Sequence, residues 1–180
     1  GRDEARGIAI EPSGMVAIVG ATASADFPIV GSYDAELTGG RDAVIIRVDD
    51  RRSGADALVY TTFLGGGDEE YGNAIAVDAA GQLYVTGYTR SENFPVTSNP
   101  LQAVRQGGYE AFISRINPDA GASGLTWSTY YGGSSTDVGT AIAVDGQGRI
   151  YMGGYTHSSN FPTGNDPFQG EYSGSADGFV

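Results

Sequence analysis

Residues 72–78 read GNAIAVD and residues 139–145 read GTAIAVD, so one seven-residue stretch returns after 67 positions. A shortened version, Ile8-Ala9-Ile10, lies 67 residues before the Ile-Ala-Val of the first stretch. A fixed period of tens of residues marks a repeat protein, and it decides the architecture before any single motif does. The chain of 180 residues therefore holds nearly three copies of one unit.

Other positions follow the same frame. Glycines and Phe-Pro pairs recur at this spacing, namely Gly14, Gly81 and Gly148, then Gly20, Gly87 and Gly154, then Phe27-Pro28, Phe94-Pro95 and Phe161-Pro162. The first copy is one residue shorter before Asp42, at a place where a loop is expected and length variation is tolerated.

Each copy contains four β-type runs bounded by turn residues, which in the middle copy are residues 74–77, 83–88, 111–116 and 125–131. The first run alternates Ala with Ile or Val, so both of its faces are apolar, as in an inner strand packed on both sides. The Asp78-Ala79-Ala80-Gly81 segment predicts a tight hairpin. Gly87 in the second run is expected to allow close approach of a neighbouring sheet.

The pattern predicts an all-β fold of β-propeller blades, each a four-stranded antiparallel sheet, because such units bury their faces only against copies of themselves. A two-sheet sandwich is the alternative, since short regular strands also fit it. We expect one partial propeller domain with blade copies at about residues 1–66, 67–133 and 134–180, the last without its fourth strand. A closed ring needs about four blades or more, so the chain is expected to be part of a larger propeller or of a ring completed by assembly.

The repeated segments resemble the bacterial SBBP β-propeller repeat family, on residues 60–66, 71–78, 83–89 and 93–95 and their counterparts. This resemblance implies blades within large bacterial proteins that are often secreted or surface-associated. We therefore expect an extracellular, cell-surface or periplasmic location. The resemblance implies no catalytic activity shared across the family and supplies no catalytic residues.

Composition excludes several function classes. The net charge of −12 argues against a nucleic acid or an anionic lipid surface as partner. All ten basic residues are Arg, and the absence of Lys excludes P-loop, Schiff-base and Ser-Lys chemistry. There is no Cys for a disulfide or thiolate metal site, and no apolar run long enough for insertion into a membrane.

Loops that could bind a partner are expected on one face of the propeller. Connections between blades share this face with those between second and third strands, and both are long here, at residues 65–73 and 89–109. The opposite face carries the tighter turns at residues 78–81 and 117–124. Because binding residues concentrate on loops held by a rigid scaffold, the long-loop face is the candidate site.

An acidic residue occupies one position of this face in every copy, at Asp3, Glu70 and Asp137. Carboxylates converging near a central channel could hold Ca²⁺ or a cationic ligand, because hard cations take several oxygen ligands. The alternative is that each acid caps a Gly-rich turn or stays solvated. We favour this second interpretation, in which no cofactor is needed.

Arg90 and His157 occupy one aligned position of the same face, which is Ala23 in the first copy. His157 is the only histidine, and catalysis through it would require an orienting acid and a nucleophile beside it. A solvated loop histidine is the simpler interpretation. The candidate binding residues are therefore Asp3, Glu70, Asp137, Arg90 and His157, and no catalytic residue is assigned.

Two aromatic pairs, Tyr88/Tyr155 and Phe94/Phe161, also recur at matched positions. Such rings could stack on a sugar or a protein partner, but their repetition favours packing between blades.

The sequence thus favours a non-enzymatic repeat scaffold that binds a protein, a glycan or further blades of the same protein. The alternative is a propeller-type lyase or hydrolase with a metal held by acids at the central channel. An enzyme should show a polar cluster that is not repeated from blade to blade, whereas the polar positions noted above recur.

Overall fold

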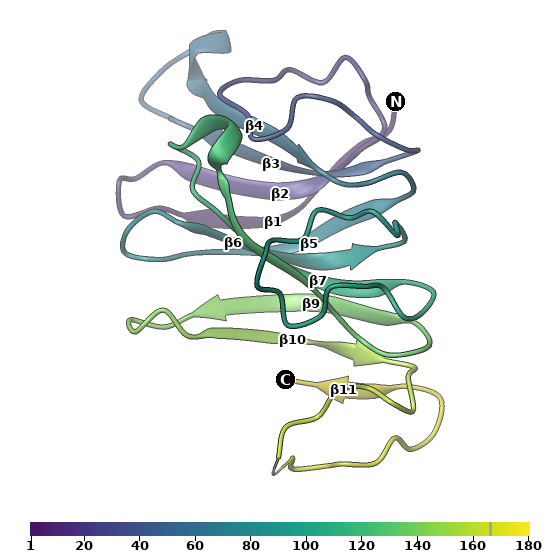
Figure 1. Ribbon diagram of the computed structural model, residues 1–180. Helices are drawn as coiled ribbons and strands as arrows, with labels where there is room; N and C mark the ends of the chain where they lie inside the picture. The colour runs from purple at the N-terminus through teal and green to yellow at the C-terminus, as the bar shows by residue number, and fades with distance from the viewer. Residues whose placement is uncertain (166) are drawn as a thin grey trace.

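The computed structural model describes residues 1–165 and 167–180, and its ribbon is a stack of three small antiparallel sheets (Figure 1). The strands are β1 (Asp3–Ile10), β2 (Val16–Thr22), β3 (Asp42–Val48), β4 (Leu58–Leu64), β5 (Glu70–Val77), β6 (Leu83–Thr89), β7 (Glu110–Ile116), β8 (Leu125–Tyr131), β9 (Asp137–Val144), β10 (Ile150–Thr156) and β11 (Asp177–Phe179). Two short 3-10 helices, η1 (Gly54–Ala57) and η2 (Gly121–Ser123), precede β4 and β8.

Each sheet is a simple meander, in the order β1-β2-β3-β4, β5-β6-β7-β8 and β9-β10-β11. Strands of different copies do not mix within a sheet, which excludes the two-sheet sandwich. The all-β propeller-blade prediction is confirmed, and we call the three sheets blades 1, 2 and 3. In the described part of the chain the blades do not close into a ring.

Neighbouring blades pack through small and branched side chains. Ala17 and Val19 of β2 are fully buried and share one apolar cluster with Ile75 of β5 and Val85 of β6. A Cβ at Gly72 would overlap the side chain of Val19, so the glycine makes room for the neighbouring blade. Contacts of this kind are what the sequence predicted for an inner strand packed on both sides.

Gly87 has a different role from the one predicted. A Cβ at Gly87 would overlap the main-chain carbonyl of Tyr71, in the adjacent strand of the same blade, and not a neighbouring sheet. The register of β5 and β6 shifts between Gly72 and Ala74, so that Asn73 forms a β-bulge. The bulge brings the two backbones too close for any side chain.

The bulge also explains why the first strand was predicted too short. The sequence placed this strand at residues 74–77, because Gly72 and Asn73 interrupt the apolar alternation. Pairing continues past the bulge, and β5 begins at Glu70. The connection between blades 1 and 2 is therefore residues 65–69, and Glu70 is the first residue of a strand.

The two ends of the stack are open. Ile8 and Ile10 of β1 are 70% and 76% exposed, whereas Ile75 of β5, the counterpart of Ile8, is 7% exposed because blade 1 covers it. At the other end Tyr151 and Tyr155 of β10 are exposed. No helix among the described residues is long and apolar enough to cross a membrane.

Candidate functional site

The repeated acids Asp3, Glu70 and Asp137 each belong to a cluster with a Thr and a Ser from the end of the adjacent strand, which we call the acid–Thr–Ser cluster. In blade 2 the Thr89 hydroxyl donates to Glu70 Oε1 (2.5 Å), and Gly66 N–H donates to Glu70 Oε2 (2.7 Å). Ser91 N–H donates to Thr89 Oγ1 (3.0 Å). The cluster ties the start of β5 to the end of β6 and to the loop before the blade.

Blades 1 and 3 repeat this arrangement. Asp137 accepts hydrogen bonds from the Thr156 hydroxyl, from the Ser158 hydroxyl (2.9 Å) and from Gly133 N–H (2.7 Å). Asp3 accepts hydrogen bonds from the hydroxyls of Thr22 and Ser24, and these bonds lower the pKa of Asp3 below its usual value.

Both oxygens of every repeated acid are therefore engaged by protein donors. The three acids lie in three different blades, and no group of three or more His, Cys, Asp or Glu side chains able to hold a metal ion is found within residues 1–165 and 167–180. This geometry supports the interpretation in which each acid organises a turn.

A second set of carboxylates was not recognised as a site from the sequence, although its positions align in the repeat. Asp42, Glu110 and Asp177 each begin the third strand of a blade and accept an N–H from the residue four positions earlier, at 2.9, 2.9 and 2.7 Å. A side chain at Gly65 would overlap both Asp42 and Glu70, so these two buried carboxyl groups pack against the same glycine.

Asp42 is the most perturbed of these groups. Burial raises the pKa of Asp42 to about 7, and the nearby Glu70 carboxylate acts in the same direction. Its Oδ1 atom is buried and has no hydrogen-bond partner among the described residues. Burial likewise raises the pKa of Glu110.

A different kind of cluster lies where β5 begins and β6 ends. The rings of Tyr71 and Tyr88 stack with centroids 4.9 Å apart, and Tyr109 meets Tyr88 edge-on at 5.1 Å. The guanidinium groups of Arg6 and Arg41, both from blade 1, lie 4.5 and 4.8 Å from the centroid of Tyr71. We call these residues, together with Arg90, the Tyr/Arg patch.

Glu4 orients the two arginines of blade 1. Its Oε1 atom accepts hydrogen bonds from Arg6 Nη2 (3.0 Å) and Arg41 Nη1 (3.1 Å). Arg90 lies 6.0 Å from the ring of Tyr109 and 3.7 Å from a carboxylate oxygen of Asp68. The attraction between a guanidinium group and the face of an aromatic ring stabilises the Tyr/Arg patch, and this attraction is stronger where water is partly excluded.

Two internal segments match a known repeat family. Residues 59–95 and 126–162 each match the SBBP beta-propeller repeat model. The chain carries SBBP beta-propeller repeats. Each matched SBBP segment runs from the fourth strand of one blade through the first two strands of the next, and so contains a complete acid–Thr–Ser cluster. No curated protein matches the chain.

Compared across the SBBP repeats, Tyr71 and Tyr109 of the Tyr/Arg patch are not repeated, whereas Tyr88 recurs as Tyr155. The aligned positions of Tyr71 are Glu4 and Val138, and those of Tyr109 are Arg41 and Ala176. The signal that could have found the patch was therefore a departure from the repeat. The expectation that every polar position recurs holds for the acids but is wrong for this cluster.

The two remaining candidate residues, Arg90 and His157, directly follow strands β6 and β10. Arg90 joins the Tyr/Arg patch. His157, at the aligned position of blade 3, is exposed, with Nδ1 2.5 Å from the carbonyl oxygen of Ser175 and its ring edge-on to Tyr155. The structure thus places one of the two in a cluster of side chains and the other in a loop contact.

Phe94 corrects one of the aromatic predictions. Its ring is buried against Phe112 and Tyr130, with centroids 4.7 and 5.7 Å away, and both partners belong to its own blade. Phe94 therefore packs its long loop onto its own sheet, whereas Phe161 also meets Tyr131 of blade 2 edge-on at 5.4 Å, so the predicted packing between blades is seen at Phe161.

Proposed function

We propose that this chain is a non-enzymatic β-propeller scaffold that binds a protein or glycan partner through the Tyr/Arg patch on its long-loop face. The observation that carries the proposal is the chemistry of the patch: it gathers tyrosine rings and guanidinium groups, which are residue types of binding surfaces, and not the converging carboxylates that the enzyme alternative needs. The repeated features build the blades, and a cluster outside the repeat needs another explanation.

The acid–Thr–Ser clusters support the scaffold part of the proposal. Their carboxylates are fully engaged in fixing the loops that join strands and blades. Loops whose ends are already fixed lose less conformational entropy when a partner binds, so they favour binding.

The residue types of the patch support a binding role. Tyr and Arg are enriched in the small sets of residues that dominate binding energy, because they offer large, partly apolar surfaces with hydrogen-bonding ends. Four of the ten arginines, Arg2, Arg6, Arg41 and Arg90, lie in or beside the patch of a chain whose net charge is −12. A partner with acidic groups and flat faces, such as an acidic glycan or an acidic protein surface, fits this chemistry.

An acidic, lysine-free propeller of this kind fits a secreted or surface-associated bacterial protein, with further blades completing the ring. This location rests on the family resemblance and on the charge of the chain, and it forms part of the same proposal.

The test is a glycan array that includes uronic-acid and sialic-acid polymers, followed by titration of each hit by calorimetry. Arg90→Ala and Tyr109→Ala should each weaken binding by about tenfold or more, as expected for central contact residues. Arg149→Ala is the matched control, because Arg149 is an exposed arginine on the β9–β10 turn that pairs only with its own hairpin.

His157→Ala separates the scaffold from the enzyme alternative and should leave binding intact. Unchanged affinity in the Arg90 and Tyr109 variants would overturn the proposed role of the patch. Turnover of an array ligand that disappears in His157→Ala would favour an enzyme.

A further inference from the structure

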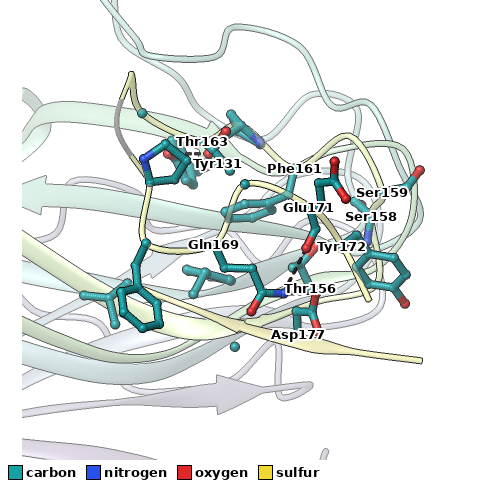
Figure 2. Close-up of a pocket in the computed structure, with 18 residues that line it drawn as sticks. Tyr131, Thr156, Ser158, Ser159, Phe161, Thr163, Gln169, Glu171, Tyr172 and Asp177 are labelled. Carbon is teal, nitrogen blue, oxygen red and sulfur yellow. Dashed lines mark hydrogen bonds between the residues drawn. The ribbon is translucent and has the colours of Figure 1, made fainter. Parts of the chain in front are cut away.

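The outer edge of blade 3 borders a cavity. β11 pairs with β10 on one side, and its other edge is unpaired within the described residues. An open cavity of about 780 Å³ lies along this edge, lined by β11 and by residues 158–164 and 167–172 between β10 and β11. Figure 2 shows Phe161 and Gln169 of these two segments at the cavity. We call this space the strand slot.

In blade 1 the corresponding space holds a strand. β4 pairs with β3 along one edge, while the long β2–β3 connection binds its other edge. Thr61 N–H donates to the carbonyl oxygen of Val30 (2.8 Å), and Phe63 N–H donates to that of Asp34 (3.2 Å). The fourth strand is thus inserted between the third strand and the long connection.

Blade 2 holds β8 in the same way, with Gln102 as the main contact. The carbonyl oxygen of Gln102 accepts Tyr130 N–H (3.2 Å), and its N–H donates to Thr129 Oγ1 (2.9 Å). Its side-chain oxygen accepts Gly132 N–H (3.0 Å), and its side-chain nitrogen donates to Glu110. One glutamine therefore binds the strand through three groups and orients itself on the acid of the third strand.

Gln169 takes this position in blade 3. Its side-chain nitrogen lies 3.2 Å from Asp177 Oδ2, the counterpart of Glu110. In blade 2 the corresponding contact, from the Gln102 side-chain nitrogen to Glu110, accompanies an amide oxygen that accepts Gly132 N–H of the fourth strand. The slot is therefore pre-arranged for such a strand.

The aromatic wall of the slot matches as well. In blade 2 the hydroxyl of Tyr130 accepts Phe94 N–H (3.0 Å) and donates to the carbonyl oxygen of Ser91 (2.8 Å). In blade 3 the rings of Phe161 and Phe179, the counterparts of Phe94 and Phe112, stack at 4.5 Å beside the cavity.

We propose that the strand slot binds an extended segment of the β8 type, with the pattern Trp or Tyr, Ser or Thr, Thr, Tyr or Phe, any residue, Gly, Gly that residues 127–133 and 60–66 share. Main-chain pairing with the free edge of β11 supplies affinity, and the aromatic side chain packed on Phe161 supplies selectivity. The occupant is an SBBP repeat strand with this pattern.

The experiment uses the full chain and a fluorescein-labelled peptide of residues 123–133, with binding measured by fluorescence anisotropy. We expect saturable binding and slower hydrogen exchange at residues 177–179. A peptide carrying Tyr130→Ala should bind about tenfold more weakly or worse, because it loses its buried ring.

Two chain variants locate the peptide. Phe161→Ala and Gln169→Ala should each weaken binding about tenfold, and Gln169 is exposed, so its replacement spares the fold. Gln147→Ala, an exposed glutamine on the β9–β10 turn, is the matched control and should bind as the unmodified chain does. Absence of binding, or equal affinity in all three variants, would overturn the proposal.

Discussion

Asp42 is a buried carboxyl group with one oxygen that lacks a protein partner and with a second carboxylate, Glu70, close by. Its ordinary pKa is 3.8, and burial raises it to about 7 in the folded chain. Between these pH values the folded state keeps a proton that the unfolded state has released. The stability associated with Asp42 is therefore complete below pH 4 and is lost as the pH rises to about 7.

We predict that Asp42→Asn removes this loss. The free energy of unfolding of the unmodified chain should fall with pH, relative to the variant, by up to about 1.4 kcal/mol per pH unit between pH 4 and pH 7. Urea unfolding at several pH values measures it. Asp56→Asn, an exposed acid in η1, should leave the pH dependence unchanged. Parallel curves for the chain and for Asp42→Asn would show that Asp42 is ionised throughout.

Gly87 carries a second prediction at this scale. Gly87→Ala should destabilise the chain by about 1–3 kcal/mol or more, because its Cβ would overlap the carbonyl of Tyr71 at the bulge. Thermal unfolding followed by circular dichroism measures the change. Gly146→Ala is the control, since open space surrounds that position, and a melting temperature equal in both variants would contradict the close approach of β5 and β6.

At the scale of the elements, the acid–Thr–Ser cluster holds together the inner hairpin of each blade and, in blades 2 and 3, also the loop before that hairpin. Thr89→Val keeps the shape of the side chain but removes the hydroxyl that binds Glu70 and Ser91. Two buried groups then lose a partner, so we expect a loss of about 1–3 kcal/mol for each unsatisfied group. Chemical denaturation measures it, with the exposed Thr140→Val as control. Equal stability of the two variants would mean that water replaces the hydroxyl without cost.

The same cluster leads to a prediction about metal ions. Because both oxygens of Asp3, Glu70 and Asp137 already accept hydrogen bonds, neither added Ca²⁺ nor a chelator should shift the melting temperature. Differential scanning fluorimetry with Mg²⁺ as the control ion checks this. A rise that is specific to Ca²⁺ would favour the carboxylate ring near the channel.

The strands show what a sequence can predict. The β8 boundaries, residues 125–131, follow from β-type residues between turns, and such local patterns survive folding unchanged. The sequence predicts a loop at Glu70, because the bulge at Asn73 breaks the alternation of side chains without breaking the strand pairing. The Tyr/Arg patch depends on Arg6 and Arg41 reaching across from another blade, and the sequence shows this contact between copies only as a departure from the repeat.

For the whole molecule, the open faces of the stack decide how copies behave in solution. Ile8 and Ile10 are exposed in β1 although the same positions of β5 are covered by a neighbouring blade. A second copy, stacked through its blade 3, could cover them in a head-to-tail contact. The net charge of −12 opposes this association through long-range repulsion.

These two effects predict self-association that increases with protein concentration and with salt, because at 0.1 M salt charges more than about 10 Å apart are screened while apolar contacts persist. Sedimentation velocity measures the mass against the 18.6 kDa of one chain.

Replacing Ile8 and Ile10 together by Thr keeps strand-forming side chains and the net charge, and should leave a monomer at every salt concentration. Val104→Thr, at an equally exposed apolar side chain in the β6–β7 loop, should associate as the unmodified chain does. A chain that stays monomeric in high salt, or a double variant that associates as strongly as the original, would mean that the exposed face of blade 1 is not an assembly surface.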